Sequence, residues 1–311
     1  MNEDVEQSRL RVSRRRALGV GGTVGLGALL AACGVGGSGS SGNGATGSAT
    51  ASATPSATAT GIQPTTTADA DVVALLDELE GSCTLSSEET QGPYWFDVDS
   101  IRSDIREDRP GTTLALALRV MDVSQCSTTG DAGTPIPNSV VEIWHCDAGG
   151  VYSGFESSSQ GGQGGGPPAG GGGSGGGDQG SGQASDGSYS QGDDEASPTD
   201  DGTYLRGAQV ADSNGIVQFT TIWPGWYRGR TVHIHLKVHI DRSTVLTTQL
   251  WFDDELNDTV FATSPYDEHT GRDTMNDDDS IIDDSGSVTV HAADDGYLGV
   301  LNLGVGGTTH S

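Results

Sequence analysis

The sequence predicts an all-β protein, either an antiparallel β-sandwich or a barrel, from three observations. Short runs rich in β-branched residues recur along the chain, and such runs favour strands. Gly, Asp, Asn and Pro separate these runs, and the sequence DSNG at 212–215 is a typical turn signal before a strand. Little of the chain has helical periodicity, apart from a short helical turn expected at 75–79. We expect strands at residues 113–123, 139–146, 216–221, 232–240, 246–252, 287–292 and 297–303.

The first 32 residues have the features of an export signal. A twin-arginine pattern, SRRRAL, occupies residues 13–18, and an apolar run at 17–30 follows it. The sequence LAAC at 30–33 has the form of a lipobox, in which Cys33 becomes the lipidated first residue of the mature protein. We therefore expect export by the twin-arginine route and a lipid anchor on the outer face of the cell membrane. The alternative is a plain N-terminal membrane anchor, although the apolar run is short for a membrane span.

Two low-complexity stretches flank and interrupt the predicted domain. Residues 33–70 are mostly Gly, Ser, Ala and Thr, which predicts a disordered tether with almost nothing to bury. Residues 157–201 are Gly-rich and then Ser- and Asp-rich, which predicts a disordered insertion, with a mobile flap near Tyr152 as the alternative. Without this insertion, the segment 71–311 has roughly 190 residues, which is enough for one domain with a single core.

The chain is strongly acidic, with a formal net charge of −28 and Lys237 as its single lysine. It offers no basic patch for a nucleic-acid backbone, so we expect no nucleic-acid partner. The same charge would repel anionic lipid headgroups. The acidic composition reflects either a strongly solvated surface or an adaptation to high salt, where screening removes self-repulsion.

Four cysteines are present, and three remain if Cys33 carries a lipid: Cys83, Cys126 and Cys146. An exported domain can hold a disulfide. Three cysteines allow three pairings, each of which leaves one thiol over, and the sequence does not choose among them. The chain has no C-x-x-C motif, so the cysteines do not indicate a zinc ribbon.

Two tyrosines and a His-x-His pair form the main candidate for a functional site. Side chains two positions apart on a strand share a face, so His233 and His235 can reach one metal ion. Tyr227 lies six residues before His233, just after a Pro-Gly turn from which it can swing back, and Tyr152 supplies a second phenol. Two imidazoles and two phenolates suit Fe(III) better than zinc or copper(I), which favour softer ligands. The alternatives are surface histidines with packing tyrosines, or a copper or zinc site.

Several segments around these residues occur in one consistent order. VEIWHCDA at 141–148 is followed by GVYS at 150–153, and PGWY at 224–227 is followed by RTVHIH at 230–235. TQLWF lies at 248–252, and ETQGPY lies earlier, at 89–94. From about residue 83 to about residue 261, with one interruption, the chain resembles the intradiol ring-cleavage dioxygenases. This is the family of catechol 1,2-dioxygenase and protocatechuate 3,4-dioxygenase.

The resemblance implies a β-sandwich with one Fe(III) at its side, held by Tyr152, Tyr227, His233 and His235. It implies that a catechol-type aromatic diol chelates the iron and that O₂ attacks the ring directly. Cleavage between the two hydroxylated carbons then gives a cis,cis-muconate-type diacid. In this reaction Tyr227 leaves the metal and accepts a substrate proton, while Arg230 and Gln249 stabilise the charge that develops on the ring.

Two features point to a particular branch of that family. The sequence shows no long helical N-terminal region, which is the element by which catechol 1,2-dioxygenases dimerise. The sequence therefore does not predict an oligomeric state. With its export signal the chain resembles an exported lipoprotein branch, for which the resemblance does not imply a substrate. The expected partners are an aromatic diol and O₂, with membrane contact only through lipidated Cys33. The alternative function is an exported β-sandwich that binds metal or aromatic compounds without dioxygenase turnover.

Overall fold

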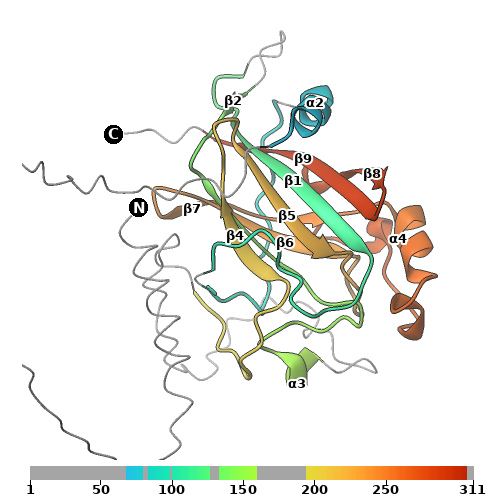
Figure 1. Cartoon of the computed structure of the whole chain (residues 1–311). Helices are drawn as coiled ribbons and strands as arrows, with labels where there is room; N and C mark the ends of the chain where they lie inside the picture. Colours follow the sequence, from blue (N-terminus) through green and yellow to red (C-terminus); the bar gives the residue numbers. More distant parts are fainter. Residues whose placement is uncertain (1–67, 80–82, 99, 127–132, 160–193, 307–311) are drawn as a thin grey trace, which may run out of the picture.

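The structure is a computed structural model that describes residues 68–79, 83–98, 100–126, 133–159 and 194–306 (Figure 1). The predicted export signal at 1–32 and the lipidation residue Cys33 lie outside these residues. So do most of the predicted tether at 33–70 and the centre of the insertion, residues 160–193. Among the described residues, no helix is both long and apolar enough to cross a membrane.

Two β-sheets form the body of the protein, which confirms the predicted all-β sandwich (Figure 1). The larger sheet has the order β2 (Thr134–Pro135), β1 (Thr113–Asp122), β9 (Gly296–Val305) and β8 (Thr289–Ala293), and β5 (Ile216–Ile222) also pairs with β1. The second sheet has the order β4 (Arg206–Val210), β3 (Val140–Trp144), β6 (His233–Ile240) and β7 (Ser243–Trp251). Among these strands β1 and β9 run parallel and the other pairs are antiparallel, so the sandwich includes one parallel pair.

Short helices flank the sheets. Helix α2 (Ala70–Glu78) extends the helical turn predicted at 75–79, and it contacts β9. Helices α3 (Glu156–Ser159) and α4 (Asp254–Phe261) lie in loops where the sequence did not predict helix. Three 3₁₀ turns follow α4: η1 (Tyr266–Glu268), η2 (Asn276–Asp278) and η3 (Asp284–Gly286).

The strand β6 is covered on both faces. Its even-numbered residues Ile234, Leu236 and Val238 belong to the main core between the sheets. All eight of its residues are buried, so the opposite face, which carries the histidines, is shielded as well. On that face Trp144 of β3 stacks on His235, and Trp95 from the loop before β1 lies under the ammonium group of Lys237. The predicted metal ligands therefore lie outside the main core, beneath residues 83–98, which we call the covering loop.

The predicted turn at 212–215 is confirmed. Asp212 Oδ1 accepts hydrogen bonds from the main-chain nitrogens of Asn214, at 2.8 Å, and Ile216, at 3.0 Å. Gly215 has a φ of 73°, a value that favours glycine. These local bonds reverse the chain between β4 and β5, as expected for an aspartate at the first position of a turn.

The structure resolves the cysteine pairing that the sequence left open. Cys83 and Cys126 form a disulfide across 43 residues, and Cys146 is a buried free thiol. The disulfide ties the start of the covering loop to the segment just after β1. The covering loop is therefore covalently attached to the sandwich.

Both ends of the predicted insertion are part of the fold. Residues 157–159 belong to α3, and Glu156 at its start donates its main-chain N–H to Asp200 at 2.8 Å. Ala196 N donates to the Trp95 carbonyl at 2.8 Å. The two described ends of the insertion therefore lie at α3, a few residues after Tyr152, and beside residues 83–98.

Candidate metal centre

His233 and His235 present one nitrogen each to a common point. Their Nε2 atoms are 3.2 Å apart. Two nitrogen ligands about 2.1 Å from one ion and at right angles lie about 3 Å apart, so this spacing fits a shared metal. His233 Nδ1 donates to the Thr231 carbonyl at 2.7 Å, which leaves the lone pair of that ring on Nε2. The indole of Trp144 holds the other ring, lying nearly parallel to His235 with the two ring centroids 5.0 Å apart.

Tyr227 completes a compact set of three donors. Its Oη lies 3.0 Å from His233 Nε2, so the side chain does swing back from the Pro-Gly turn toward the histidines. The ring of Tyr227 meets that of His233 edge to face, with the centroids 5.5 Å apart. Tyr227 is also partly exposed, whereas both histidines are buried. Of these three donor residues, Tyr227 is therefore the only one with appreciable exposure to solvent.

Tyr152, the fourth predicted donor, lies beside Tyr227 and His235. The residue is 1% exposed, and its Oη has no hydrogen-bond partner. Its ring centroid lies 5.9 Å from that of Tyr227 and 6.1 Å from that of His235. An unpartnered buried hydroxyl costs on the order of 1–3 kcal/mol, so a ligand that binds here would relieve an existing penalty.

Two glycines allow the tyrosine loops to approach each other. A Cβ atom on Gly150 would come within 2.4 Å of the Trp226 carbonyl oxygen, and Gly150 has a φ of 80°. A Cβ atom on Gly225 would come within 2.2 Å of the Asp147 carbonyl oxygen. The main chains on either side of the site are thus packed against each other, which fixes the distance between Tyr152 and Tyr227.

The electrostatics of the four side chains fit a cation. Burial, and then the Arg230 charge, lowers the pKa of His233 to about 3, while burial and then His233 lower the pKa of His235 well below its usual value. Burial raises the pKa of both Tyr152 and Tyr227 above the usual tyrosine range. Both imidazoles are therefore neutral and ready to donate a lone pair. The phenols need a nearby positive charge in order to ionise at neutral pH.

Arg230 and Gln249 lie together beside this set. Arg230 Nη2 donates to Gln249 Oε1 at 2.5 Å, and Gln249 Nε2 donates to the Thr90 carbonyl at 2.8 Å. Gln249 on β7 is the cross-strand partner of His235 on β6, which explains why it faces the same side. The structure thus brings all six predicted site residues into one region, although metal binding by four of them stays a prediction.

Three nearby residues escaped sequence reasoning. They are Trp144, which stacks on His235, Gly92, whose missing side chain leaves room for that ring, and Asp279, which binds Arg230. Asp279 stands in a run of aspartates, 277–279, and nothing in the sequence separates it from its exposed neighbours. Across the described chain, no three His, Cys, Asp or Glu side chains cluster in a metal-binding arrangement. The candidate centre contains only two such residues because its other donors are phenols.

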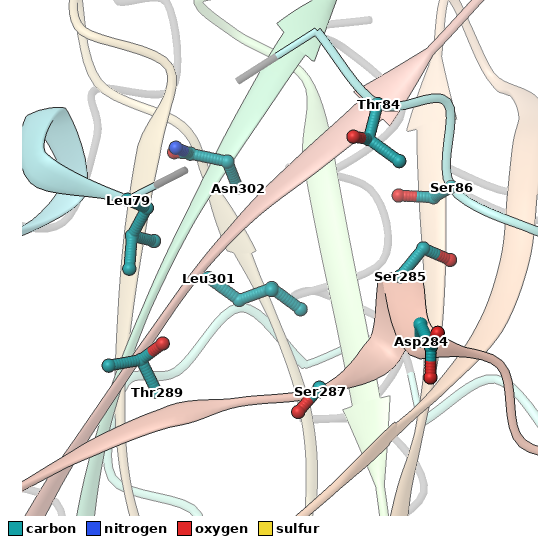
Figure 2. A pocket seen from close by; sticks show the side chains of 9 residues that line it. All are labelled: Leu79, Thr84, Ser86, Asp284, Ser285, Ser287, Thr289, Leu301 and Asn302. Atoms are coloured by element: carbon teal, nitrogen blue, oxygen red, sulfur yellow. The ribbon is translucent and has the colours of Figure 1, made fainter. Parts of the chain in front are cut away.

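A separate hollow of about 240 Å³ opens between the end of α2, η3, β8 and β9 (Figure 2). Six of its nine lining residues carry hydroxyl or amide side chains, and none of the predicted site residues lines it. Its lining residues are Leu79, Thr84, Ser86, Asp284, Ser285, Ser287, Thr289, Leu301 and Asn302.

Several solved structures are similar to this one. An intradiol ring-cleavage dioxygenase from Tetranychus urticae has 29% sequence identity and a TM-score of 0.57, over 74% of this chain and 98% of its own. A second dioxygenase crystal structure has the same identity and TM-score, over 74% of this chain and 97% of its own. The dioxygenase domain of a carbohydrate-binding fusion protein from Streptomyces has 23% identity and a TM-score of 0.44, over 72% of this chain and 99% of its own.

No family model and no curated protein matches the chain. The two matches with a TM-score of 0.57 extend over nearly the full length of the solved proteins. The similarity therefore extends over most of each chain and is not limited to a single motif. The protein has the all-β fold of the intradiol ring-cleavage dioxygenases.

Proposed function

We propose that the protein is an Fe(III)-dependent intradiol dioxygenase that cleaves a catechol-type aromatic with O₂ to a cis,cis-muconate-type product. Tyr152, Tyr227, His233 and His235 are the proposed ligands. The observation that carries this proposal is the convergence of three donor atoms. Tyr227 Oη lies 3.0 Å from His233 Nε2, which in turn lies 3.2 Å from His235 Nε2. The fold shared with an intradiol ring-cleavage dioxygenase supports the same reaction class.

Bound Fe(III) would supply the positive charge that ionises the phenols and the Lewis acidity that activates a chelated catechol. The two tyrosines differ in access, and this divides their roles. Tyr152 is fully buried and packed among aromatic rings, so it stays in place. Tyr227 is partly exposed, so its Oη can separate from the histidines and accept a proton from an incoming diol.

Arg230 and Gln249 hold a fixed charge and a fixed dipole beside the ligands. The guanidinium is always protonated, and its hydrogen bond to Gln249 restricts where it points. A reacting ring carries more negative charge at its carbon atoms than the bound diol does. A prepositioned cation therefore favours the reacting state over the ground state and raises kcat more than it tightens binding.

Three measurements on the purified, iron-loaded protein test this function. We expect about one iron per chain, a visible tyrosinate-to-Fe(III) charge-transfer band, and O₂ uptake with catechol that yields a muconate-type absorbance. Tyr227→Phe should shift or weaken the band in a folded protein, because one phenolate donor is lost. A colourless protein that takes up zinc in preference to iron would contradict the metal assignment.

The same measurements separate the alternative function. A protein that shows the visible band but takes up no O₂ with any of several catechols would be a metal-binding or aromatic-binding module. The presence of Arg230 and Gln249 beside the four donors favours catalysis, since a binding module does not need a charge aimed at a reacting ring.

We also propose that the protein is exported by the twin-arginine route and anchored by a lipid on Cys33. The sequence at 13–33 supports this, and so does the disulfide between Cys83 and Cys126, because disulfides persist in oxidising compartments. Changing Arg14 and Arg15 to Lys should trap the precursor inside the cell. Cell fractionation measures this, and continued export and lipidation of the double variant would contradict the twin-arginine route.

A further inference from the structure

Asp279 is a buried carboxylate that binds two groups beside the candidate centre. Its Oδ2 accepts a hydrogen bond from Arg230 Nε at 2.8 Å and another from Thr231 N at 2.8 Å. Its Oδ1 accepts from Ile281 N at 2.9 Å, which fixes the carboxylate plane. The Asp279 side chain is 1% exposed and that of Arg230 is 12% exposed, so this ion pair is shielded from solvent.

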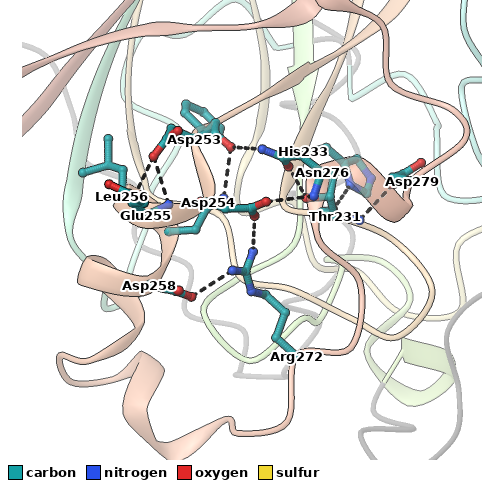
Figure 3. Close-up of polar contacts among 12 residues, drawn as sticks. Thr231, His233, Asp253, Asp254, Glu255, Leu256, Asp258, Arg272, Asn276 and Asp279 are labelled. Carbon is teal, nitrogen blue, oxygen red and sulfur yellow. Dashed lines mark hydrogen bonds and ion pairs between the residues drawn. The ribbon is translucent and has the colours of Figure 1, made fainter.

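Thr231 links Asp279 to the proposed ligand His233. The Thr231 carbonyl accepts from His233 Nδ1, while the Thr231 amide donates to Asp279 (Figure 3). Thr231 Oγ1 is held as well, by a hydrogen bond to Asn276 Oδ1 at 2.5 Å. The position of the carbonyl that selects the His233 tautomer therefore depends on the loop that carries Asn276 and Asp279. Partners of this kind orient metal ligands and set their basicity.

The guanidinium of Arg230 is fixed from two separate elements. Asp279, just after η2, accepts a hydrogen bond from Nε, and Gln249 on β7 accepts one from Nη2. A single bond would leave a long side chain free to rotate, whereas two bonds on different edges define its plane. Although burial alone would raise the pKa of Asp279, its bonds to Thr231 and Arg230 hold that pKa below the usual range. The carboxylate is thus charged at neutral pH.

We propose that Asp279 is a positioning residue, which orients the Arg230 guanidinium toward the reacting ring and fixes the Thr231 carbonyl that sets the His233 tautomer. This inference rests on the proposed dioxygenase function for its catalytic part. A carboxylate suits the role because one oxygen can accept from both Arg230 Nε and Thr231 N while pairing with the positive charge.

The kinetic test compares Asp279→Asn with Asp278→Asn in the iron-loaded protein. Asp278 is an exposed neighbour, so its replacement makes the same change in charge without touching Arg230. We expect Asp279→Asn to lower kcat about 10- to 100-fold with a much smaller change in KM, a typical loss for a residue that orients a site. Asp278→Asn should stay within about twofold of wild type, as exposed charges contribute little. A wild-type kcat for Asp279→Asn would overturn the proposal.

A double-mutant cycle separates positioning from general structural damage. If Asp279 acts on turnover through Arg230, adding Asp279→Asn to Arg230→Ala should lower kcat by no more than about twofold further. Independent, multiplying losses would contradict the proposed route. If Asp279→Asn fails to fold, Asp279→Glu keeps the charge but moves it by one methylene, and an unchanged kcat in that variant would also reject the positioning role.

The proposed effect of Asp279 on the His233 tautomer can be tested without iron and without turnover. Nitrogen-15 NMR of the metal-free protein should show His233 protonated at Nδ1 in wild type and in Asp278→Asn, with a smaller Nδ1-protonated fraction in Asp279→Asn. An unchanged fraction would reject the link through Thr231. If the wild-type protein takes up no O₂ with any catechol, the dioxygenase function fails, while this measurement still decides whether Asp279 orders the histidine.

Discussion

At the scale of single residues, Gly92 shows how closely the covering loop meets the candidate centre. Gly92 has a φ of 70°, and a Cβ atom there would lie 3.0 Å from His235 Cε1 and 3.4 Å from Nε2. We expect Gly92→Ala to displace the imidazole by a few tenths of an ångström and to lower iron occupancy about tenfold or more, because metal affinity depends on ligand orientation. Metal analysis after dialysis against a weak chelator measures the occupancy.

Gly271→Ala is the matched control for this change. Gly271 also has a positive φ, 97°, but a Cβ atom there would meet nothing within 4 Å. Both variants carry the backbone strain of a non-glycine residue, about 1–2 kcal/mol, and only Gly92→Ala crowds a histidine. Equal iron content in the two variants would contradict the predicted contact.

Glu89, in the same loop, predicts an unusual dependence of stability on pH. Both carboxylate oxygens are shielded from solvent. Burial raises the pKa of Glu89 from 4.5 to about 7, against the opposing effects of the Asp283 main chain and Arg230. Between these pH values the folded protein keeps a proton that the unfolded chain has released. The contribution of Glu89 to the free energy of unfolding therefore falls as the pH rises from 4.5 to 7.

Glu89→Gln should remove this contribution. Relative to wild type, we expect the variant to gain stability as the pH rises from about 5 to about 8, in urea-denaturation series at both values. Glu88→Gln is the control, because it makes the same charge change at an exposed neighbour. A difference between wild type and Glu89→Gln that stays constant with pH would contradict the raised pKa.

The residues of the centre show what the sequence could predict. The His233–His235 pair follows from the two-residue repeat of a strand, and Tyr227 follows from a turn six residues earlier. Asp279 was out of reach, because it lies 49 residues after Arg230 and meets it only through the folded loop after α4. Trp144 lies within the VEIWHCDA motif at 141–148, but its stacking on His235 depends on β3 pairing with β6.

At the scale of elements, side-chain composition explains which strands the sequence predicted. Strands rich in Val, Ile and Leu, such as β1, β3 and β6, fall within the predicted runs. Strand β4, with the sequence RGAQV, was not predicted, because a buried arginine and a glycine replace the expected β-branched residues. Helix α4, with the sequence DELNDTVF, is polar and short, and its main start signal is the side chain of Asp253, which caps two main-chain nitrogens.

Helix α2 is attached to the larger sheet by one fully buried leucine, by one ion pair, and by hydrogen bonds from β1 and β9 to its main-chain carbonyls. Leu76 is 0% exposed, and Arg119 on β1 donates to Asp77 at 2.7 Å. We expect Leu76→Ala to lower the free energy of unfolding by about 2–3 kcal/mol, near the lower end for buried leucines because the cluster is small. Urea denaturation measures the loss.

Leu75→Ala is the matched control for the docking of α2. It removes the same atoms from a neighbouring side chain that is only partly buried. We expect it to cost less than half as much as Leu76→Ala, since the transfer free energy scales with the apolar area buried. Equal losses in the two variants would show that the helix does not dock through Leu76.

At the scale of the whole molecule, the chain closes by pairing its first long strand with its last. Strands β1 and β9 run parallel, from Leu114 beside Tyr297 to Asp122 beside Val305. Hydrophobic patterns predict that both strands exist, but they hold no information about a partner more than 170 residues away. The sequence also did not predict that the covering loop covers the outer face of β6, because this irregular segment has no helical or strand repeat of hydrophobic residues.

The disulfide makes this cover part of the molecule's stability. Cys83 and Cys126 are 43 residues apart in the sequence, and the segment between them includes the covering loop and β1. The chain-entropy model gives about 4 kcal/mol for a loop of this length, and measured values for such bonds range down to about zero. We expect Cys83→Ser with Cys126→Ser to lower the melting temperature and to lower iron retention, because Gly92 and Trp95 are then held only by non-covalent contacts. Reductant should lower the melting temperature of wild type and leave that of the double variant unchanged. If reductant affects both equally, the disulfide does not fasten the cover, and the hydrogen bonds of Glu89 to Thr247 and Ala196 to Trp95 are sufficient to hold it.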